Sequence, residues 1–168
     1  MRSFIGVFMV TTFIATTFCD VPEGYTVNPT DNYGYKVMYQ SQNWTVARDT
    51  CASMGAKLAV PKSREQFNFI QRLVATMHYP SIVGTKFKLL VWLGISNLDN
   101  YQTWKNIDGE NINDTGFHTW SGHNGNISEN PAEPHCVGMD AANPGLRDWW
   151  CHKRQPYICE IQTQENHQ

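Results

Sequence analysis

The four cysteines that follow the N-terminal segment constrain the fold of this chain more than any other feature. They are Cys51, Cys136, Cys151 and Cys159. An even number of cysteines in a small exported domain predicts disulfides, and the count alone does not choose among the three possible pairings. A zinc site is the competing interpretation, but no two of these cysteines have the short spacing that structural zinc ligands prefer. We therefore expect two disulfides.

The N-terminal segment predicts that the chain is exported. Arg2 is the only charged residue before Asp20, and an apolar stretch lies between them. This pattern is typical of a secretory signal peptide, which we place at residues 1–19, so the mature protein is expected to be secreted and extracellular. A membrane anchor is the alternative, but the apolar run of about 15 residues is shorter than the ~20 that span a bilayer. Cys19 would remain as an extra thiol only if cleavage came before it.

Length and charge narrow the organisation and the function. The chain has 168 residues, which is enough for one domain. Its formal net charge of −2 argues against the clustered positive charge that binding to nucleic acid requires. We expect a lead-in segment over residues 20–32, one folded domain over residues 33–161 and a polar tail over residues 162–168, with no membrane span.

Hydrophobic periodicity predicts two helices ahead of most of the strands. Apolar residues three and four apart predict a helix over residues 44–54, which Gly55 ends. A second helix begins at Ser63, where Gln66 completes a capping-box pattern, and it ends before Pro80. Strands are predicted at residues 35–39, 89–93, 104–107, 136–139 and 157–161. Residues 20–34 are expected to be irregular and residues 110–135 to form a long polar loop. Segregated helices and strands predict an α+β fold.

The motifs, taken in order, resemble those of the C-type lectin domain. The first helix carries its Trp-x-x-Ala-x-x-x-Cys pattern as Trp44, Ala47 and Cys51. The other matches are Gly55-Ala56-Lys57-Leu58-Ala59, Glu65, Val91-Trp92-Leu93-Gly94-Ile95, Trp104, Asp108-Gly109, Trp120 and the closing Tyr157-Ile158-Cys159-Glu160. The resemblance covers residues 33–161 and is closest, in general pattern, to the single-domain secreted lectins of invertebrates.

The resemblance implies a fold, a disulfide pairing and a class of function. The fold has two helices, short antiparallel sheets and a long polar loop, and the implied disulfides are Cys51–Cys159 and Cys136–Cys151. The implied function is non-catalytic recognition, and the chain contains none of the common catalytic motifs, so we do not expect an enzyme. The expected partner is a glycan, and an extracellular protein is the alternative.

In this family a calcium ion held by the protein binds the sugar, and such an ion takes six to eight oxygen ligands. The resemblance places ligand positions on Asn124 and Asn126 in the long loop, on Glu133 near the third cysteine and on Asp148 near the fourth. Trp149, next to Asp148, is expected to stack on a sugar or to anchor a protein partner. Counting back from the third cysteine instead places the loop ligands within residues 126–131.

Three departures from the family pattern bear on calcium. Gly125 stands where the family has a proline whose cis peptide holds the flanking ligands, and cis peptides are essentially restricted to proline. Glu133 lies one residue early. Arg147 brings a permanent positive charge without acceptor atoms to a ligand position. A calcium-dependent site and a degenerate site without the metal both stay open. The departures favour the degenerate site, in which Asp148 pairs with Arg147 or Lys153.

Other candidate sites lie in or near the same loop. Three sequons predict N-glycosylation at Asn43, Asn113 and Asn126. An alternative metal site would use imidazole and carboxylate ligands, which suit transition metals. Its candidate ligands are His118, His123 and His135 with Glu129 and Glu133. Their irregular spacing favours solvated histidines instead.

Overall fold

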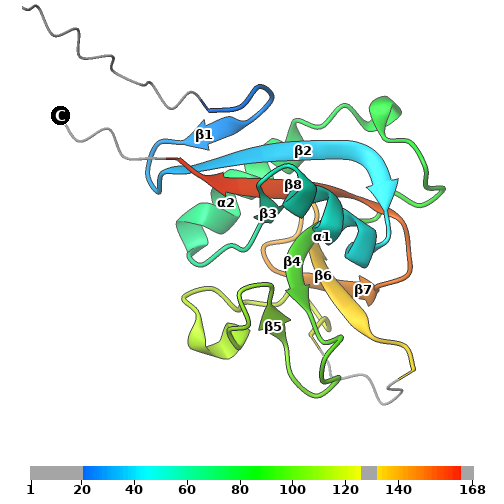
Figure 1. Cartoon of the computed structure of the whole chain (residues 1–168). Coiled ribbons are helices and arrows are strands. Elements are labelled where there is room, and N and C mark those ends of the chain that lie inside the picture. Colours follow the sequence, from blue (N-terminus) through cyan, green and yellow to red (C-terminus); the bar gives the residue numbers. More distant parts are fainter. Residues whose placement is uncertain (1–20, 126–131, 164–168) are drawn as a thin grey trace, which may run out of the picture.

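A computed structural model, which describes residues 21–125 and 132–163, confirms the predicted α+β class (Figure 1). The helices are α1 (Trp44–Ser53) and α2 (Arg64–Ala75), with the 3₁₀ turns η1 (Tyr79–Ser81) and η2 (Ile112–Asp114). The strands are β1 (Thr26–Asn28), β2 (Tyr33–Gln42), β3 (Lys57–Leu58), β4 (Val91–Ser96), β5 (Lys105–Asn106), β6 (His135–Met139), β7 (Arg147–Trp150) and β8 (Gln155–Gln162). The predicted signal peptide lies outside the described residues.

The strands form one sheet whose last strand lies in the middle. The order is β1-β2-β8-β4-β6-β7, with β3 added to β8 and β5 to β4. Neighbours run antiparallel, except for the parallel pair of β4 and β8. The end of β8 lies beside the start of β2, where Thr163 N and Oγ1 both donate to Asn32 O at 2.7 Å (Figure 1). β8 therefore joins β1 and β2 to the strands that carry the long loop.

Both helices begin at residues whose side chains cap the first turn. Asn43 Oδ1 accepts a hydrogen bond from Val46 N at 2.9 Å, and Ser63 Oγ accepts one from Gln66 N at 3.1 Å. After α1, Gly55 has a φ of +70°, a conformation that favours glycine and ends the helix. These helix starts and the stop after α1 agree with the sequence prediction.

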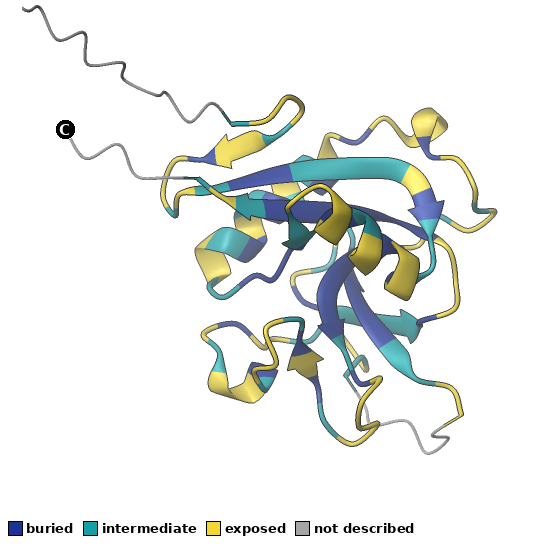
Figure 2. Ribbon diagram, in the orientation of Figure 1, coloured by how far each residue is buried: buried dark blue, intermediate teal, exposed yellow. Residues whose placement is uncertain are grey.

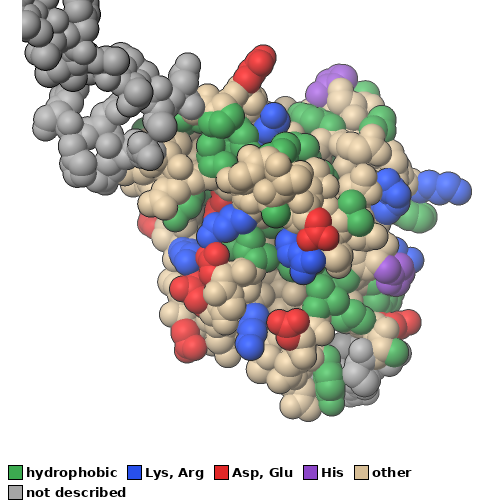
Figure 3. Space-filling view, in the orientation of Figure 1, with side chains coloured by type: hydrophobic (Ala, Val, Ile, Leu, Met, Phe, Trp, Pro, Cys, Tyr) green, Lys and Arg blue, Asp and Glu red, His purple; other side chains and the backbone are tan. Residues whose placement is uncertain are grey.

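The surface carries charges of both signs. On the face seen in Figure 3, Lys and Arg side chains are interspersed with Asp and Glu, in agreement with the small net charge of the chain. Within the described part of the chain, no helix is long and apolar enough to cross a membrane.

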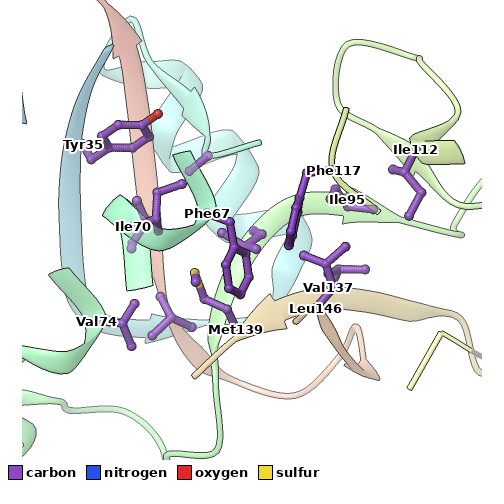
Figure 4. Packing of buried hydrophobic residues seen from close by; sticks show 14 of the residues in the cluster. Tyr35, Phe67, Ile70, Val74, Ile95, Ile112, Phe117, Val137, Met139 and Leu146 are labelled. Atoms are coloured by element: carbon purple, nitrogen blue, oxygen red, sulfur yellow. The ribbon is translucent and has the colours of Figure 1, made fainter. Parts of the chain in front are cut away.

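The main hydrophobic core lies between α2 and the sheet. β4, β6 and β8 are the most continuously buried strands (Figure 2), and α2 places Phe67, Ile70 and Val74 against them (Figure 4). Phe67 also stacks on Phe117 of the long loop, with ring centroids 4.5 Å apart. Burying a side chain of this size stabilises the fold by about 1.5–3 kcal/mol. The core therefore extends under the long loop and supports it.

Both disulfides implied by the resemblance are present. Cys51–Cys159 ties α1 to β8 across 108 residues, and Cys136–Cys151 ties β6 to the residue after β7 across 15 residues. All four cysteines are buried. The second disulfide fixes the β6–β7 pair at the place where the long loop returns to the sheet.

Three segments differ from the sequence prediction. The lead-in, expected to be irregular, contains β1, which pairs with β2. The long loop contains η2, and β8 runs one residue into the expected polar tail, to Gln162. β1 has only three residues, too few to show a hydrophobic period, so its pairing with β2 rather than its own sequence defines it.

Candidate functional site

The long loop packs onto the β6–β7 pair next to the second disulfide. Ser121 N donates to Leu146 O at 2.9 Å, and Leu146 N donates to Thr119 O at 2.8 Å. These bonds bring the end of the loop to β7. Two of the predicted ligands, Asn124 and Asp148, which are 24 residues apart in sequence, are therefore in hydrogen-bond contact.

Asp148 is the centre of a closed group of hydrogen bonds, here called the Asp148 cluster, which consists of Asn124, Gly125, His135 and Asp148. Asp148 Oδ1 accepts from Gly125 N at 2.7 Å, and Oδ2 accepts from His135 Nδ1 at 2.6 Å. Because an ionised carboxylate only accepts, His135 Nδ1 carries the proton. The side chain of Asp148 is 12% exposed. Hydrogen bonds to a charged group contribute about 1.5–3 kcal/mol each, so the cluster fastens the loop to β6 and β7.

The side chain of Asn124 is bonded within the protein at both of its polar atoms. Its Oδ1 accepts from Asp148 N at 3.1 Å, and its Nδ2 donates to Ser121 O. The oxygen that was predicted as a metal ligand therefore holds the start of β7 instead.

Gly125 has a conformation that the proline of the family could not adopt. Its φ is +84°, whereas the ring of proline holds φ near −65°. A Cβ at this position would lie 2.3 Å from Cδ2 of the Trp120 ring. Trp104 Nε1 donates to Gly125 O at 3.1 Å, so the two tryptophans enclose the glycine. The loop is therefore shaped around Trp104 and Trp120.

Arg147 lies away from the Asp148 cluster. Its guanidinium contacts the Asp140 carboxylate and donates to Leu89 O at 3.2 Å. Burial raises the pKa of Asp140, but hydrogen bonds from Asn143, Ala142 and Arg147 outweigh that effect and lower the pKa to about 2. The predicted pairing of Asp148 with Arg147 or Lys153 is wrong, because successive strand residues point to opposite faces and Asp148 meets His135.

The described residues do not fit a calcium ion in the Asp148 cluster. Asn124 Oδ1 and both carboxylate oxygens of Asp148 accept hydrogen bonds from the protein itself. Two donors, Gly125 N and His135 Nδ1, point at the carboxylate where a cation would have to lie. Glu133 is exposed, and no bond joins it to the cluster among the described residues. The predicted ligand Asn126 lies outside those residues.

The alternative histidine site also finds no support. Among residues 21–125 and 132–163, no group of three or more His, Cys, Asp or Glu side chains could hold a metal ion. Glu129 lies outside these ranges. His135 instead donates to Asp148, and its backbone N donates to Asn97 Oδ1 at 2.8 Å, which holds the residue in place.

Trp149 lines a separate groove, here called the aromatic groove, of about 320 Å³. The groove lies between residues 85–89 and the end of β7 with the turn that follows it. Its lining residues are Thr85, Phe87, Leu89, Trp149, Trp150, Lys153, Arg154 and Gln155. Sequence reasoning singled out Trp149 but missed Phe87, whose signal is an aromatic residue between two lysines just before an apolar strand. Neither Asn124 nor Asp148 lines this groove.

The predicted glycosylation sites differ in exposure. Asn113 is exposed in η2, and Asn43 is half-buried at the start of α1. Asn126 lies outside the described residues. Glycosylation at the three sequons stays a prediction.

Comparison with known proteins agrees with the fold and the motifs. The family model described as Lectin C-type domain matches residues 40–161. The CD209 antigen of Symphalangus syndactylus is 24% identical over 131 residues, which are 76% of this chain and 29% of that protein. The chain thus spans less than a third of the length of this relative.

Solved structures show the same fold at low sequence identity. The carbohydrate-recognition domain of the mouse scavenger receptor C-type lectin has a TM-score of 0.66 at 19% identity, covering 86% of this chain and 100% of its own. A calcium-independent type II antifreeze protein has a TM-score of 0.65 at 22% identity, covering 85% and 95%. The family model covers most of the chain and the disulfides and sheet agree with it, so the chain belongs to the C-type lectin domain family.

Proposed function

We propose that this chain is a secreted, non-catalytic recognition protein that binds carbohydrate without calcium. Carbohydrate binding is proposed from the family to which the chain belongs. One observation carries the calcium independence. Both carboxylate oxygens of Asp148 accept hydrogen bonds, from Gly125 N and from His135 Nδ1.

In this proposal, protein donors replace a metal ion as the means of shaping the long loop. A cation would bring Asn124 and Asp148 together through their oxygens. Here Asp148 N donates to Asn124 Oδ1, and His135 Nδ1 donates a hydrogen bond to the carboxylate. The end of the loop and β7 are held together by these bonds, so the loop conformation needs no bound ion.

The structural neighbours support a metal-independent member of the fold. One is described as a calcium-independent type II antifreeze protein and another as a Ca2+-dependent type II antifreeze protein in its Ca2+-free form. Both have a TM-score of 0.65 with this chain. The fold is therefore compatible with either mode of action, and the Asp148 cluster favours the calcium-independent one.

An extracellular protein partner is the second candidate. Because Asn124 Oδ1 and both carboxylate oxygens of Asp148 accept hydrogen bonds from the protein, the Asp148 cluster does not fit a metal ion through which sugar hydroxyls would be held. The antifreeze neighbours also indicate that the fold serves ligands other than sugars.

Binding of the secreted chain to an array of immobilised glycans tests the proposal. The array is probed in millimolar calcium and again in chelator, with a calcium-dependent C-type lectin as a control that loses its signal in chelator. We expect the same glycans to bind this chain with equal affinity in both buffers. A glycan signal that disappears in chelator would contradict calcium independence, and the absence of any glycan signal would favour the protein partner.

A further inference from the structure

We propose that the aromatic groove is the ligand site and that its ligand is an acidic glycan, a sugar chain carrying sulfate or carboxylate groups. This inference rests on the proposed function, carbohydrate recognition, and adds the location and the ligand class. The groove has about the volume of a small ligand site, 320 Å³, and its lining combines aromatic side chains with Lys153 and Arg154.

The two walls of the groove are held in place by one buried residue, Gln155. Its side chain is 1% exposed. Gln155 Nε2 donates to Phe87 O at 2.7 Å, and Oε1 accepts from Leu89 N at 3.2 Å. These bonds fix the wall formed by residues 85–89 to the first residue of β8. The groove is therefore preformed, which lowers the entropic cost of binding.

Phe87 is an exposed aromatic ring on a fixed backbone. Its side chain is 69% exposed, the highest value among the large exposed hydrophobic residues of the described chain. Phe87 N donates to Thr85 Oγ1 at 3.3 Å, and Phe87 O is held by Gln155. An apolar ring held in solvent by polar bonds to its own backbone is not explained by folding. It is suited to pack against the C–H face of a sugar ring.

On the opposite wall, two tryptophans extend the aromatic surface. Trp149 and Trp150 are half-buried, and their rings meet edge to face with centroids 4.9 Å apart. The disulfide at Cys151 and the pairing of β7 with β6 hold this part of the chain. Stacking surfaces therefore stand on both sides of the groove.

Positive charge around the groove is not neutralised by the protein. Lys153 and Arg154 line the groove, and Lys86 stands in sequence between the lining residues Thr85 and Phe87. All three are exposed, and none forms an ion pair with an acidic side chain of the described residues; the Lys153 ammonium lies 5.6 Å from the centroid of the Trp150 ring. Among residues 21–125 and 132–163, no acidic side chain lines the groove. On the right edge of Figure 3, basic side chains stand next to hydrophobic surface, where Figure 1 places the segment between η1 and β4. Arg154 is held by Ser41 O at 2.9 Å, so its charge has a fixed position.

Together these features select an anionic ligand with apolar ring faces. A neutral sugar would leave the three cations without an anionic partner among the described residues, although the chain as a whole is negative. An acidic peptide would satisfy the charges, but rigid aromatic rings on both walls favour a chain of rigid rings over a flexible one, which loses more entropy on binding. In an acidic glycan, the sugar rings would stack on the aromatic side chains of both walls, and the acidic groups would pair with the basic side chains.

Binding of a labelled heparin hexasaccharide to the secreted full chain tests this inference, with the desulfated, N-acetylated and carboxyl-reduced hexasaccharide as the matched neutral ligand. We expect the sulfated probe to bind at least about tenfold more tightly at low salt, and this preference to shrink as salt screens the exposed charges. Phe87→Ala should weaken binding of the sulfated probe about tenfold. The double variant Lys86→Gln/Lys153→Gln should weaken it to a similar degree, about threefold per lysine.

Two matched variants control for general effects of the substitutions. Tyr101→Ala removes an exposed aromatic side chain and Lys105→Gln an exposed lysine, both outside the groove. Both should bind as the unchanged protein does, and all variants should keep its melting temperature.

Each other outcome has a distinct meaning. If the chain binds glycans but the groove variants bind as well as the unchanged protein, the groove is not the site, and the proposed function stands. If neither hexasaccharide binds and the glycan array is also silent, both proposals fail. If an acidic peptide binds in a manner lost on Phe87→Ala while the sulfated probe does not bind, the ligand class is wrong.

Discussion

Asp148 joins the long loop to β6 through hydrogen bonds, and in the proposed function these bonds take the place of a bound calcium ion. Its two carboxylate oxygens accept hydrogen bonds from the long loop and from β6, through Gly125 N and His135 Nδ1. A carboxylate that is mostly buried is stable as an anion only when its oxygens are satisfied. At the scale of single residues, the conformation of the loop thus depends on this carboxylate and on the glycine that reaches it.

Asp148→Ala should destabilise the fold, because it leaves the donors of Gly125 and His135 without their acceptor. Loss of a largely buried acceptor of this kind costs about 2–3 kcal/mol of the free energy of unfolding. Urea unfolding with the disulfides intact measures it. Asp114→Ala, at an exposed position in η2, is the control and should change stability by less than about 0.5 kcal/mol. Equal effects of the two substitutions would contradict the role given to Asp148.

Gly125→Ala should destabilise the fold more than the same change at another glycine with an equal backbone conformation. Gly125 and Gly109 have φ values of +84° and +85°, but a Cβ at Gly125 would meet the Trp120 ring at 2.3 Å, whereas nothing lies within 4 Å at Gly109. Gly109→Ala should cost about 1 kcal/mol for the backbone alone, and Gly125→Ala about 1–3 kcal/mol more for the collision.

The melting temperatures of the two variants provide the comparison. If both fall by the same amount, Trp120 does not confine the loop at Gly125.

At the scale of elements, the central strand β8 carries a buried acid. Glu160 is 2% exposed, and its Oε2 accepts from Val60 N at 3.1 Å. Lys57 of β3 approaches Oε1 at 3.6 Å. Burial raises the pKa of Glu160 to about 7, although Lys57 and Val60 N act in the opposite direction. The folded protein therefore holds this proton more tightly than the unfolded chain does, whose glutamate has its ordinary pKa of 4.5.

It follows that the stability of the domain should fall as pH rises from about 4.5 to 7. In this range the folded state binds more protons than the unfolded state, so the free energy of unfolding decreases with pH, by about 3 kcal/mol in all. Glu160→Gln should remove this slope. Urea unfolding between pH 4 and 8 measures it, and a slope that persists in the variant would show that another group causes it.

Asp140, beside β6, should give the opposite dependence in a different range. Its pKa is lowered to about 2 from an ordinary 3.8, so the stability that it contributes is complete above pH 3.8 and is lost as pH falls through 2. Asp140→Asn should therefore leave the slope between pH 4.5 and 7 unchanged, which makes it the matched control for Glu160→Gln.

The sequence predicted best the elements whose apolar residues recur with a helical spacing or form a continuous apolar run. α1, α2, β4 and β8 show apolar spacing or continuous apolar runs, and their positions were predicted to within a few residues. β1 has only three residues, and the parallel contact of β4 with β8 joins segments far apart in the chain, so no local pattern encodes either of them.

The candidate site was likewise predicted in part from the sequence. Motif spacing brought Asn124 and Asp148 to one place, but the partner of Asp148 was missed because His135 lies on another strand. The direction of Arg147 follows from Asp140 and the pleat of β7, which the sequence does not reveal. Phe87 was missed because it is a single exposed residue outside the helices and strands, so it is not part of any hydrophobic pattern.

At the scale of the whole molecule, the two disulfides are expected to contribute unequally to the free energy of unfolding. Cys51–Cys159 closes 108 residues and Cys136–Cys151 closes 15. Chain-entropy estimates give about 4.7 kcal/mol for a loop near the first length and about 3 kcal/mol for the second. Replacing Cys51 and Cys159 by alanine should therefore lower the free energy of unfolding more than replacing the other pair. Urea unfolding of the two double variants measures this, and the reverse order would contradict the estimate.

We propose that this C-type lectin domain folds, and holds its long loop in place, without calcium. The most direct test is a thermal melt of the secreted chain in millimolar calcium and in chelator, with the Asp148→Ala variant alongside. We predict the same melting temperature in both buffers. An ion that binds only the folded state would add about 2.7 kcal/mol at a hundred times its dissociation constant, and a domain of this size would melt several degrees higher. A rise of that kind in calcium, absent in the Asp148→Ala variant, would contradict the claim.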